Sequence, residues 1–297
     1  MYTVCGAFAL RLPCRGRYNE KKSLAGERMK RLKYKALLLD IDGTLVVPGE
    51  PCIRPGVVRA LRQAQQQGVL VILATGRTAF AAGKEVLAGL RPDYGIYANG
   101  AWVLDRQGQT VLEDRLTAQN MYTLVDFCED YDYPLAFCYE DGYYVYVEYE
   151  RMRDCYQEMT GHGDHTKDGE DQDRHLQSMP FAAFVMMPPE AVEAYHAKYP
   201  GLKFAPYSID RYDVFKPENS KAEAAKKLLD KLGISPEEVL AIGDGVNDLE
   251  MLELAGCSYA MANAPAQVQA AADHLAPDVR QEGVAAVVRE VFLGGNS

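Results

Sequence analysis

Short apolar runs alternate with segments of helical periodicity along most of the chain. The first apolar runs cover residues 35–40, 69–77 and 94–100, and such continuous runs are typical of parallel strands covered on both faces. A segment of helical spacing, residues 55–68, lies between the first two runs and begins at Pro55, because proline is favoured at a helix start. This alternation predicts βαβ units and a mainly parallel sheet, which is the α/β class.

The same alternation returns near the C-terminus. Residues 220–233 have apolar side chains at helical spacing and end at Gly233, and residues 238–244 form another apolar run. A helical segment, residues 248–256, follows, and the sequences SYAMANA and PAQVQAAAD predict one more strand and helix. We expect these segments to complete the sheet that the first strands begin.

The chain between them has a different pattern. The Asp-Gly pair at 141–142 separates two alternating aromatic runs, which predicts an antiparallel hairpin, and residues 181–208 have the pattern strand, helix, strand. Antiparallel strands within a parallel α/β chain indicate an inserted α+β domain. We expect residues 104–206 to form this insertion and residues 34–103 and 207–297 to form the core.

Two polar segments carry no periodicity. Residues 160–175 are predicted to be a long loop, and His162 and His165 within it to be solvated, because no further metal ligand has a recognisable spacing. Residues 1–33 are basic and are predicted to be a flexible leader, although an Arg-rich leader could also be an address signal. Met29, just before the first strand, could be the translation start.

Composition narrows the function classes. The net charge of −10 argues against a protein that binds nucleic acid non-specifically, and no segment approaches the roughly 18 apolar residues of a membrane span. The seven cysteines are odd in number and never spaced as C-x-x-C, which indicates reduced thiols and a cytoplasmic protein. They are Cys5, Cys14, Cys52, Cys128, Cys138, Cys155 and Cys257.

Acidic side chains gather at the predicted carboxyl ends of the strands. Asp40, Thr75 and Asp244 each end a strand, and ligands of open α/β sheets bind outside those ends. Asp42 and Asp248 add two more carboxylates. Carboxylate oxygens are the ligands that Mg²⁺ prefers, and the cation would compensate the charges of the aspartates. The sequence therefore predicts a magnesium site.

Donor groups are predicted beside these carboxylates. Thr75, the backbone of Gly76, Lys221 and Asn247 offer hydrogen-bond donors and one positive charge, which suits a phosphoryl group.

Other interpretations of the acidic motifs are weaker. An EF-hand loop that starts at Asp40 would need glycine at its sixth position and glutamate at its twelfth, where Leu45 and Pro51 stand. GDGVND lacks the spacing of a dinucleotide-binding loop, and the sequence has no GxxxxGK[ST] motif. Asp40 and Asp42 could be turn or cap residues, but that alternative does not explain four polar motifs in order.

Together these motifs resemble the haloacid dehalogenase superfamily of phosphatases, in particular Cof-type members with a C2-type cap domain. The resemblance covers about residues 34–297 and rests on DIDGTL (40–45), ATGR (74–77), the lysine of NSKAEA and GDGVNDLEML (243–252). YANGA and AMANAP also resemble Cof-type segments. The resemblance implies a Rossmann-like core into which the cap domain is inserted. Lys221 is preferred to Lys216 as the motif lysine, because Lys221 follows Ser220 at a helix start.

The resemblance also implies a mechanism. Asp40 would form an aspartyl-phosphate, and Asp42 would serve as general acid and base. Mg²⁺ would be held by the carboxylates of Asp40 and Asp244 and the backbone carbonyl of Asp42, with Asp248 as a ligand or a supporting partner. Thr75, Lys221 and Asn247 would hold the phosphoryl group, assisted by backbone donors near Gly43.

The expected substrate is a small phosphorylated metabolite, such as a sugar phosphate. A phosphotransferase or phosphomutase would share every core motif, and a phosphate-sensing protein would normally have lost Asp40 or Asp42. The five tyrosines around the predicted hairpin could present hydroxyls to a sugar or form an ordinary sheet face. They are Tyr139, Tyr143, Tyr144, Tyr146 and Tyr149. The sequence does not specify the phosphate ester or the oligomeric state.

Overall fold

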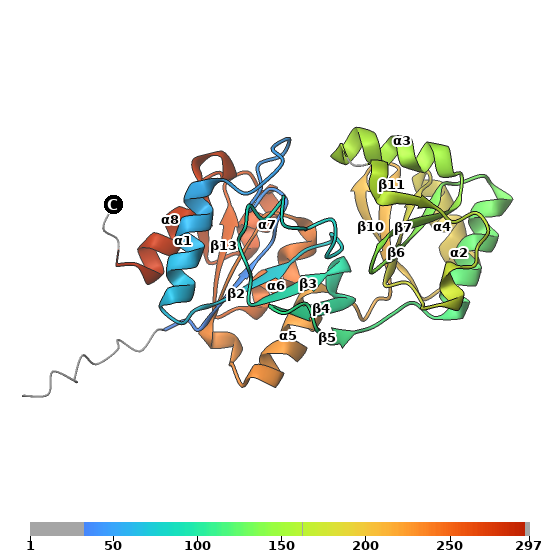
Figure 1. Cartoon of the computed structure of the whole chain (residues 1–297). Helices are drawn as coiled ribbons and strands as arrows, with labels where there is room; N and C mark the ends of the chain where they lie inside the picture. Colours follow the sequence, from blue (N-terminus) through green and yellow to red (C-terminus); the bar gives the residue numbers. More distant parts are fainter. Residues whose placement is uncertain (1–32, 162, 295–297) are drawn as a thin grey trace, which may run out of the picture. The chain divides into compact units, whose positions relative to one another are not determined.

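The computed structural model describes residues 33–161 and 163–294, and their strands form two sheets (Figure 1). The first has the strand order β14-β13-β12-β1-β2-β3-β4-β5, and the second has the order β10-β11-β9-β6-β7-β8. Apart from Lys33, the expected leader lies outside the described residues, as do Met29, Cys5 and Cys14. The five described cysteines are free thiols.

The first sheet is parallel from β14 to β3 and antiparallel from β3 to β5. Its strands are β1 (Ala36–Leu39), β2 (Leu70–Ala74), β3 (Tyr94–Tyr97), β4 (Trp102–Asp105), β5 (Thr110–Glu113), β12 (Val239–Gly243), β13 (Cys257–Met261) and β14 (His274–Ala276). The predicted parallel α/β sheet is confirmed, and an antiparallel edge is added to it.

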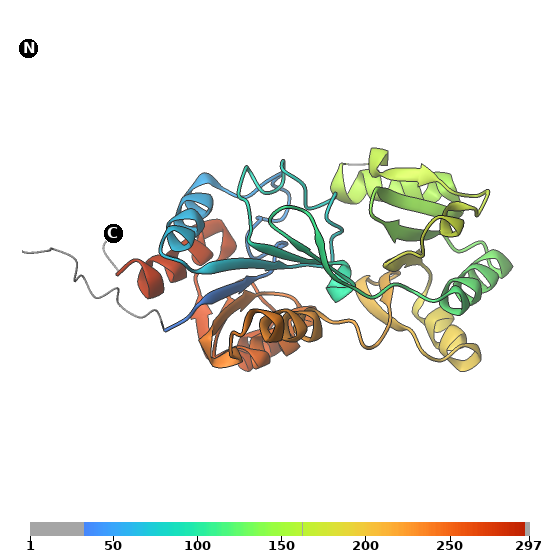
Figure 2. The same cartoon turned by 60° about the horizontal axis from the view of Figure 1, so that its bottom comes forward.

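Helices cover both faces of this sheet (Figure 2). They are α1 (Pro55–Gln66), α5 (Lys221–Leu232), α6 (Leu249–Leu254), α7 (Ala266–Ala271) and α8 (Gly283–Phe292). Alternate residues of β1, Ala36 and Leu38, pack with α5, α6 and α7 in one hydrophobic cluster. Leu37 and Leu39 are also fully buried, which accounts for the continuously apolar strand in the sequence.

One face of the second sheet packs against two of the three helices of this unit, α2 (Ala118–Asp130) and α4 (Pro189–Lys198). Its strands are β6 (Leu135–Tyr139), β7 (Gly142–Val147), β8 (Thr166–Asp168), β9 (Ala182–Met186), β10 (Lys203–Ser208) and β11 (Arg211–Phe215), and the third helix is α3 (Tyr149–Thr160). Phe127 of α2 and Tyr195 of α4 share a hydrophobic cluster with Phe137 and Val185 of the sheet. This α+β unit is the insertion that the sequence predicts.

Two local predictions for this unit need correction. The loop predicted for residues 160–175 contains strand β8, which pairs in parallel with β7. Three polar residues at a sheet edge leave no apolar period, so the sequence could not show this strand. In the hairpin, Tyr139 lies opposite Gly142, so Glu140 and Asp141 form the turn rather than the Asp-Gly pair at 141–142.

The expected domain limits also differ from the sheets. Strands β4 and β5 fall largely within the expected insertion of residues 104–206 but belong to the first sheet, and β11 lies after it but belongs to the second. We propose that the insertion spans residues 114–216. None of the helices in the described ranges is long and apolar enough to cross a membrane.

Gly100 shows how tightly the loop after β3 is packed. Its φ of 105° is left-handed, and a methyl group at this position would overlap the carbonyl oxygen of Ser220, just before α5. We expect Gly100→Ala to lower the free energy of unfolding by about 2–5 kcal/mol, because backbone strain and steric overlap add.

Gly201→Ala is the matched control, because Gly201 has a φ of 113° with no atom within 4 Å of the added methyl group. Its expected loss is about 1–3 kcal/mol, from backbone strain alone. Urea denaturation of both variants measures the difference. Equal losses would show that the approach to Ser220 is not tight.

Candidate active site

The parallel strand order brings distant sequence motifs together. Strands β12, β1 and β2 are neighbours, so Asp244, Asp40 and Thr75, each the residue after its strand, lie at the same edge of the sheet. Lys221 is the first residue of α5, whose N-cap Ser220 accepts a hydrogen bond from the backbone N–H of Glu223 at 3.1 Å. The sequence predicted this convergence.

A buried lysine lies between two buried carboxylates. The Nζ of Lys221 is 2.6 Å from Asp40 Oδ1 and 2.7 Å from Asp248 Oδ1, and the three residues are 2%, 5% and 0% exposed. Burial alone would lower the pKa of Lys221, but the two carboxylates raise it above its ordinary value. The lysine is therefore a fixed cation, and the three side chains form a buried charge cluster, here called the lysine cluster.

Asp248 is held from both sides. Its Oδ1 accepts from Lys221, and its Oδ2 accepts from the backbone N–H groups of Asp244 and Gly245, at 3.0 and 2.8 Å. Because each oxygen already has a donor, Asp248 is well placed to orient the GDGVND loop.

Asp244 has a second set of partners. Thr44 Oγ1 donates to its Oδ1 at 2.8 Å, and Asn263 Nδ2 lies 3.3 Å from its Oδ2 and donates to the carbonyl of Gly43 at 2.9 Å. Gly43 has a φ of 83°, and a methyl group there would overlap Asp244 Oδ2. Glycine and threonine of the DIDGTL motif therefore make room for Asp244 and bind it.

The acidic groups concentrate negative charge. Burial raises the pKa of Asp40 well above its usual value, and the nearby carboxylates add to this shift while Lys221 opposes it. Burial, followed by the charges of other carboxylates, raises the pKa of Asp244 to about 6, against the Thr44 hydrogen bond. Lys221 alone does not offset these charges.

Three carboxylates of the site could hold a cation. One oxygen from each of Asp40, Asp244 and Asp248 can be chosen such that all lie within 4.8 Å of one another. An all-oxygen donor set with excess negative charge fits a hard cation such as Mg²⁺.

Asp42 lies apart from this cluster. Its side chain is 55% exposed, and Arg77 binds both of its oxygens, Nε to Oδ2 at 2.8 Å and a terminal nitrogen to Oδ1 at 2.6 Å. The partner of Arg77 could not be predicted, because its position in ATGR does not show which carboxylate its side chain reaches.

The remaining predicted residues lie around the same strand ends. Thr75 is buried, and its Oγ1 accepts from the backbone N–H of Arg77 at 3.1 Å across Gly76. Asn247 is exposed, and its Nδ2 donates to Asn99 Oδ1 at 3.2 Å. Sequence reasoning missed Asn99 and Asn263, although YANGA and AMANAP contain them.

The competing lysine is placed elsewhere. Lys216, directly after β11, pairs with Asp114, directly after β5. It takes no part in the lysine cluster.

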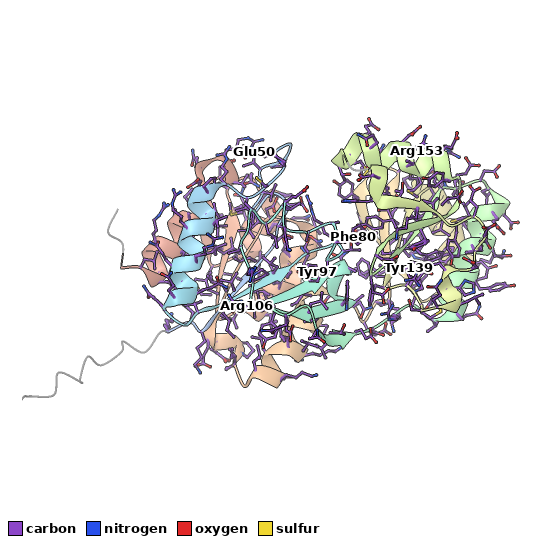
Figure 3. The ribbon with its side chains drawn as sticks, in the orientation of Figure 1. Glu50, Phe80, Tyr97, Arg106, Tyr139 and Arg153 are labelled. Carbon is purple, nitrogen blue, oxygen red and sulfur yellow. The ribbon has the colours of Figure 1, made fainter. Side chains whose placement is uncertain are left out.

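Residues of the second sheet contact loops of the first. Phe80, labelled in Figure 3, lies 5.1 Å from the ring of Tyr143 and 5.3 Å from the ring of His165, and Thr78 Oγ1 is 3.4 Å from the Tyr143 hydroxyl. Tyr139 and Tyr146, by contrast, belong to the cluster under α2 and α4. The tyrosine hairpin is therefore largely an ordinary sheet face. His162 lies outside the described residues.

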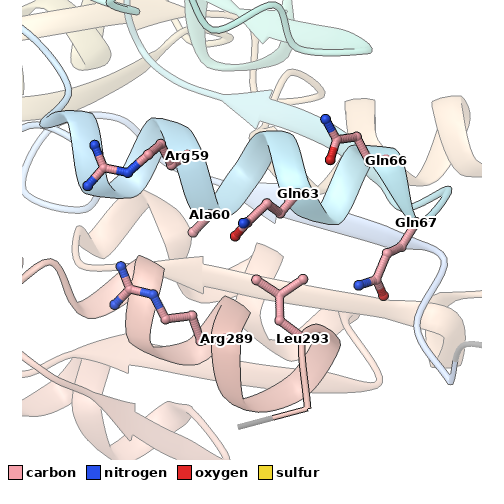
Figure 4. Close-up of a pocket in the computed structure, with 7 residues that line it drawn as sticks. All are labelled: Arg59, Ala60, Gln63, Gln66, Gln67, Arg289 and Leu293. Carbon is pink, nitrogen blue, oxygen red and sulfur yellow. The ribbon is translucent and has the colours of Figure 1, made fainter. Parts of the chain in front are cut away.

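A separate hollow lies between α1 and α8 (Figure 4). It is lined by Arg59, Ala60, Gln63, Gln66, Gln67, Arg289 and Leu293, and by none of the carboxylates above. Its amide and guanidinium groups provide no nucleophile, so the chemistry belongs to the strand ends.

The fold and the lysine cluster define an α/β protein with a buried acidic site at its strand ends. Residues 37–288 match the model of haloacid dehalogenase-like hydrolases, so the chain belongs to this family. The resemblance of the motifs to the haloacid dehalogenase superfamily is thus confirmed.

Several named proteins are similar to this chain. The chloroplastic endoribonuclease YBEY of Arabidopsis thaliana is 26% identical over 92% of this chain and 49% of its own length, so the chain spans about half of that relative. The putative phosphatase YxeH of Bacillus subtilis is 29% identical over 88% of this chain and 99% of its own. Among solved structures, the phosphatase BT1666 of Bacteroides thetaiotaomicron has a TM-score of 0.79 at 24% identity, covering 91% of this chain and 98% of its own.

Removal of the buried ammonium tests the lysine cluster. We expect Lys221→Met to lower the free energy of unfolding by about 3–5 kcal/mol in Mg²⁺-free buffer at pH 7, because two buried carboxylates lose their cation. The loss of the ammonium also raises the pKa of Asp40 further. The deficit should therefore shrink as the pH falls and the carboxyl group becomes protonated.

Lys216→Met serves as the control, since it breaks a partly exposed ion pair worth about 1 kcal/mol or less. Urea denaturation at several pH values compares the two variants. A Lys221→Met deficit that equals the control, or that grows at low pH, would contradict the assigned charges.

Proposed function

We propose that the protein is a Mg²⁺-dependent phosphatase of small phosphorylated metabolites, of the sugar-phosphate kind, that acts through an aspartyl-phosphate. The observation that carries this proposal is the lysine cluster, which fixes Asp40 beside a permanent cation at the strand ends. Membership of the hydrolase family and the named phosphatase relatives support it.

Asp40 is the proposed nucleophile. One of its oxygens forms a bond to phosphorus while the bond from phosphorus to the leaving oxygen breaks. Water then attacks the phosphorus, the phosphorus–Asp40 bond breaks, and inorganic phosphate leaves. Lys221 orients the attacking carboxylate and favours its ionised form, which opposes the effect of burial on the pKa of Asp40.

Asp42 is the proposed general acid and base. It donates a proton to the departing oxygen and later accepts one from the attacking water. Arg77 binds both carboxylate oxygens in this structure, so the acid step requires Asp42 to release at least one of these contacts. Arg77 thus binds Asp42 at the exposed side of the site until the acid step begins.

Asp40 and Asp244 are the proposed carboxylate ligands of Mg²⁺, with the Asp42 backbone carbonyl as a third group. The bound cation supplies positive charge for the phosphoryl oxygens and offsets the excess of carboxylates. Asp248 is assigned a supporting role, because both of its oxygens already accept hydrogen bonds.

The phosphoryl group would be held by donors from four segments of the chain. Thr75 and the Gly76 backbone follow β2, Lys221 begins α5, and Asn247 precedes α6, with backbone donors near Gly43 completing the set. Each comes from the end of a strand or the start of a helix, and the strand order places these segments at the same edge of the first sheet.

The second sheet and its helices are proposed to be a C2-type cap that limits the size of the substrate. Small phosphorylated metabolites should therefore be preferred to phosphoproteins. A phosphotransferase would use the same residues and would transfer the phosphoryl group to an acceptor other than water. Cytoplasmic location stays a prediction.

The carboxylate site leads to a direct test of the class. Hydrolysis of an aryl phosphate should require Mg²⁺, be lost in EDTA and return with added Mg²⁺. Asp40→Asn should abolish it, because the amide is a far weaker nucleophile. Release of inorganic phosphate measures the reaction, and full activity in EDTA or in Asp40→Asn would refute the assignment.

The role of Asp42 depends on the leaving group. A sugar alkoxide needs a proton as it departs, whereas p-nitrophenolate is stable without one, and general acid catalysis contributes about 10²–10⁴-fold where it is needed. Asp42→Asn should therefore slow phosphoryl transfer from sugar phosphates more than from p-nitrophenyl phosphate.

Single-turnover kinetics isolates this step from the later attack of water. Asp40→Asn is the comparison, since it should abolish transfer from both substrates. Equal losses for the two leaving groups in Asp42→Asn would mean that Asp42 is not the acid.

A further inference from the structure

Asn99 is held in an unusual backbone conformation at the centre of the site. Its φ is 51°, and the preceding residue, Ala98, has a φ of 48°. Asn99 is buried, with 4% of its surface exposed. Its backbone N–H donates to the carbonyl of Thr75 at 3.1 Å. A left-handed conformation costs free energy in a residue other than glycine and persists where the surroundings impose it.

The Asn99 side chain connects the two sheets. Its Nδ2 donates to Asp213 Oδ2 on β11 at 3.2 Å, and its Oδ1 accepts from Asn247 Nδ2 at 3.2 Å. Asp213 Oδ2 also approaches Gly76, since a methyl group at Gly76 would lie 3.2 Å from it. Asn99, Asn247 and Lys221 line one small hollow.

The order of donors in this chain of hydrogen bonds is set at one end. An ionised carboxylate can only accept, so Asp213 draws the NH₂ group of Asn99 toward itself and turns the Asn99 oxygen toward Asn247. Asn247 must then present its NH₂ group. An amide nitrogen carries two hydrogens, so the second N–H of Asn247 remains for another acceptor.

We propose that Asp213 is a positioning residue that sets, through Asn99, the donor orientation of Asn247 toward the phosphoryl group. A residue of the second sheet thereby controls phosphate affinity at the ends of the first. This inference rests on the proposed function, in which Asn247 binds the transferring group.

An exchange of the two side chains tests the proposal. Asn99→Asp places a carboxylate opposite Asp213, and the repulsion between them disrupts the contact. In the double variant Asn99→Asp/Asp213→Asn, the new amide donates to the new carboxylate, which still accepts from Asn247. The matched control is Asp210→Asn, because Asp210 lies in the exposed turn between β10 and β11.

Titration calorimetry with inorganic phosphate and Mg²⁺ measures affinity, and thermal unfolding is recorded for every variant. We expect Asn99→Asp to weaken phosphate binding about tenfold or more. The double variant should return to within about threefold of the wild-type affinity, and the control should match the wild type. A double variant that regains its thermal stability but not its phosphate affinity would show a merely structural contact and overturn the proposal.

The same series separates this inference from the proposed function. If the wild type binds phosphate but hydrolyses no ester, the phosphatase assignment fails, while the binding data still decide whether Asp213 positions Asn247. Phosphate affinity that is unchanged in Asn99→Asp would refute the positioning role even in an active phosphatase. A wild type that binds no phosphate would overturn both.

Discussion

The ion pairs of Lys221 with Asp40 and Asp248 are the constraint on which the other features of the site depend. Buried charges of this kind are tolerated only when they are paired and hydrogen-bonded, and the loss of one partner is costly. The end of β1 supplies Asp40, and the first position of α5 supplies Lys221. The loop after β12 supplies Asp248, which two backbone N–H groups hold in place. With two carboxylates for one ammonium, the cluster keeps an excess of negative charge. That excess explains why a cation beside Asp244 is chemically favourable.

The site divides into a fixed half and an exposed half. Asp40, Asp248 and Lys221 are buried and bound to one another, so their geometry is set before any ligand arrives. Asp42 and Asn247 are exposed. Asp42 is bound by Arg77, and Asn247 donates a hydrogen bond to Asn99. Surface ion pairs and single amide hydrogen bonds are weak compared with the buried pairs. A nucleophile benefits from a fixed position, whereas a group that must exchange protons with a leaving group and with water benefits from access to solvent.

The sequence predicted the parallel sheet and the convergence of Asp40, Thr75 and Asp244, because strand ends and helix starts leave local signals. It did not predict the partners that hold these groups. Asn263 reaches Asp244, and Arg77 reaches Asp42, through contacts between loops that are far apart in sequence. Periodicity shows which residues face a core, but it does not show which side chain a polar residue will meet. The sheet to which β4 and β5 belong was missed for a similar reason, since an antiparallel strand has the same alternation in either sheet.

The insertion leaves the first sheet and returns to it at one place, close in sequence to Lys221. Asp114, after β5, pairs with Lys216, after β11, and its backbone carbonyl accepts from the Asn219 side chain at 3.1 Å. Asn219 is 3% exposed and lies two residues before Lys221, whose buried ion pairs resist displacement. The two ends of the insertion are therefore tied to each other by Asp114 and Lys216, and to the segment that carries Lys221 by Asn219. Asp40 is held by Lys221 of the first unit, whereas Asn99 is bound to the second sheet through Asp213 and the loop of Phe80 contacts it through Tyr143.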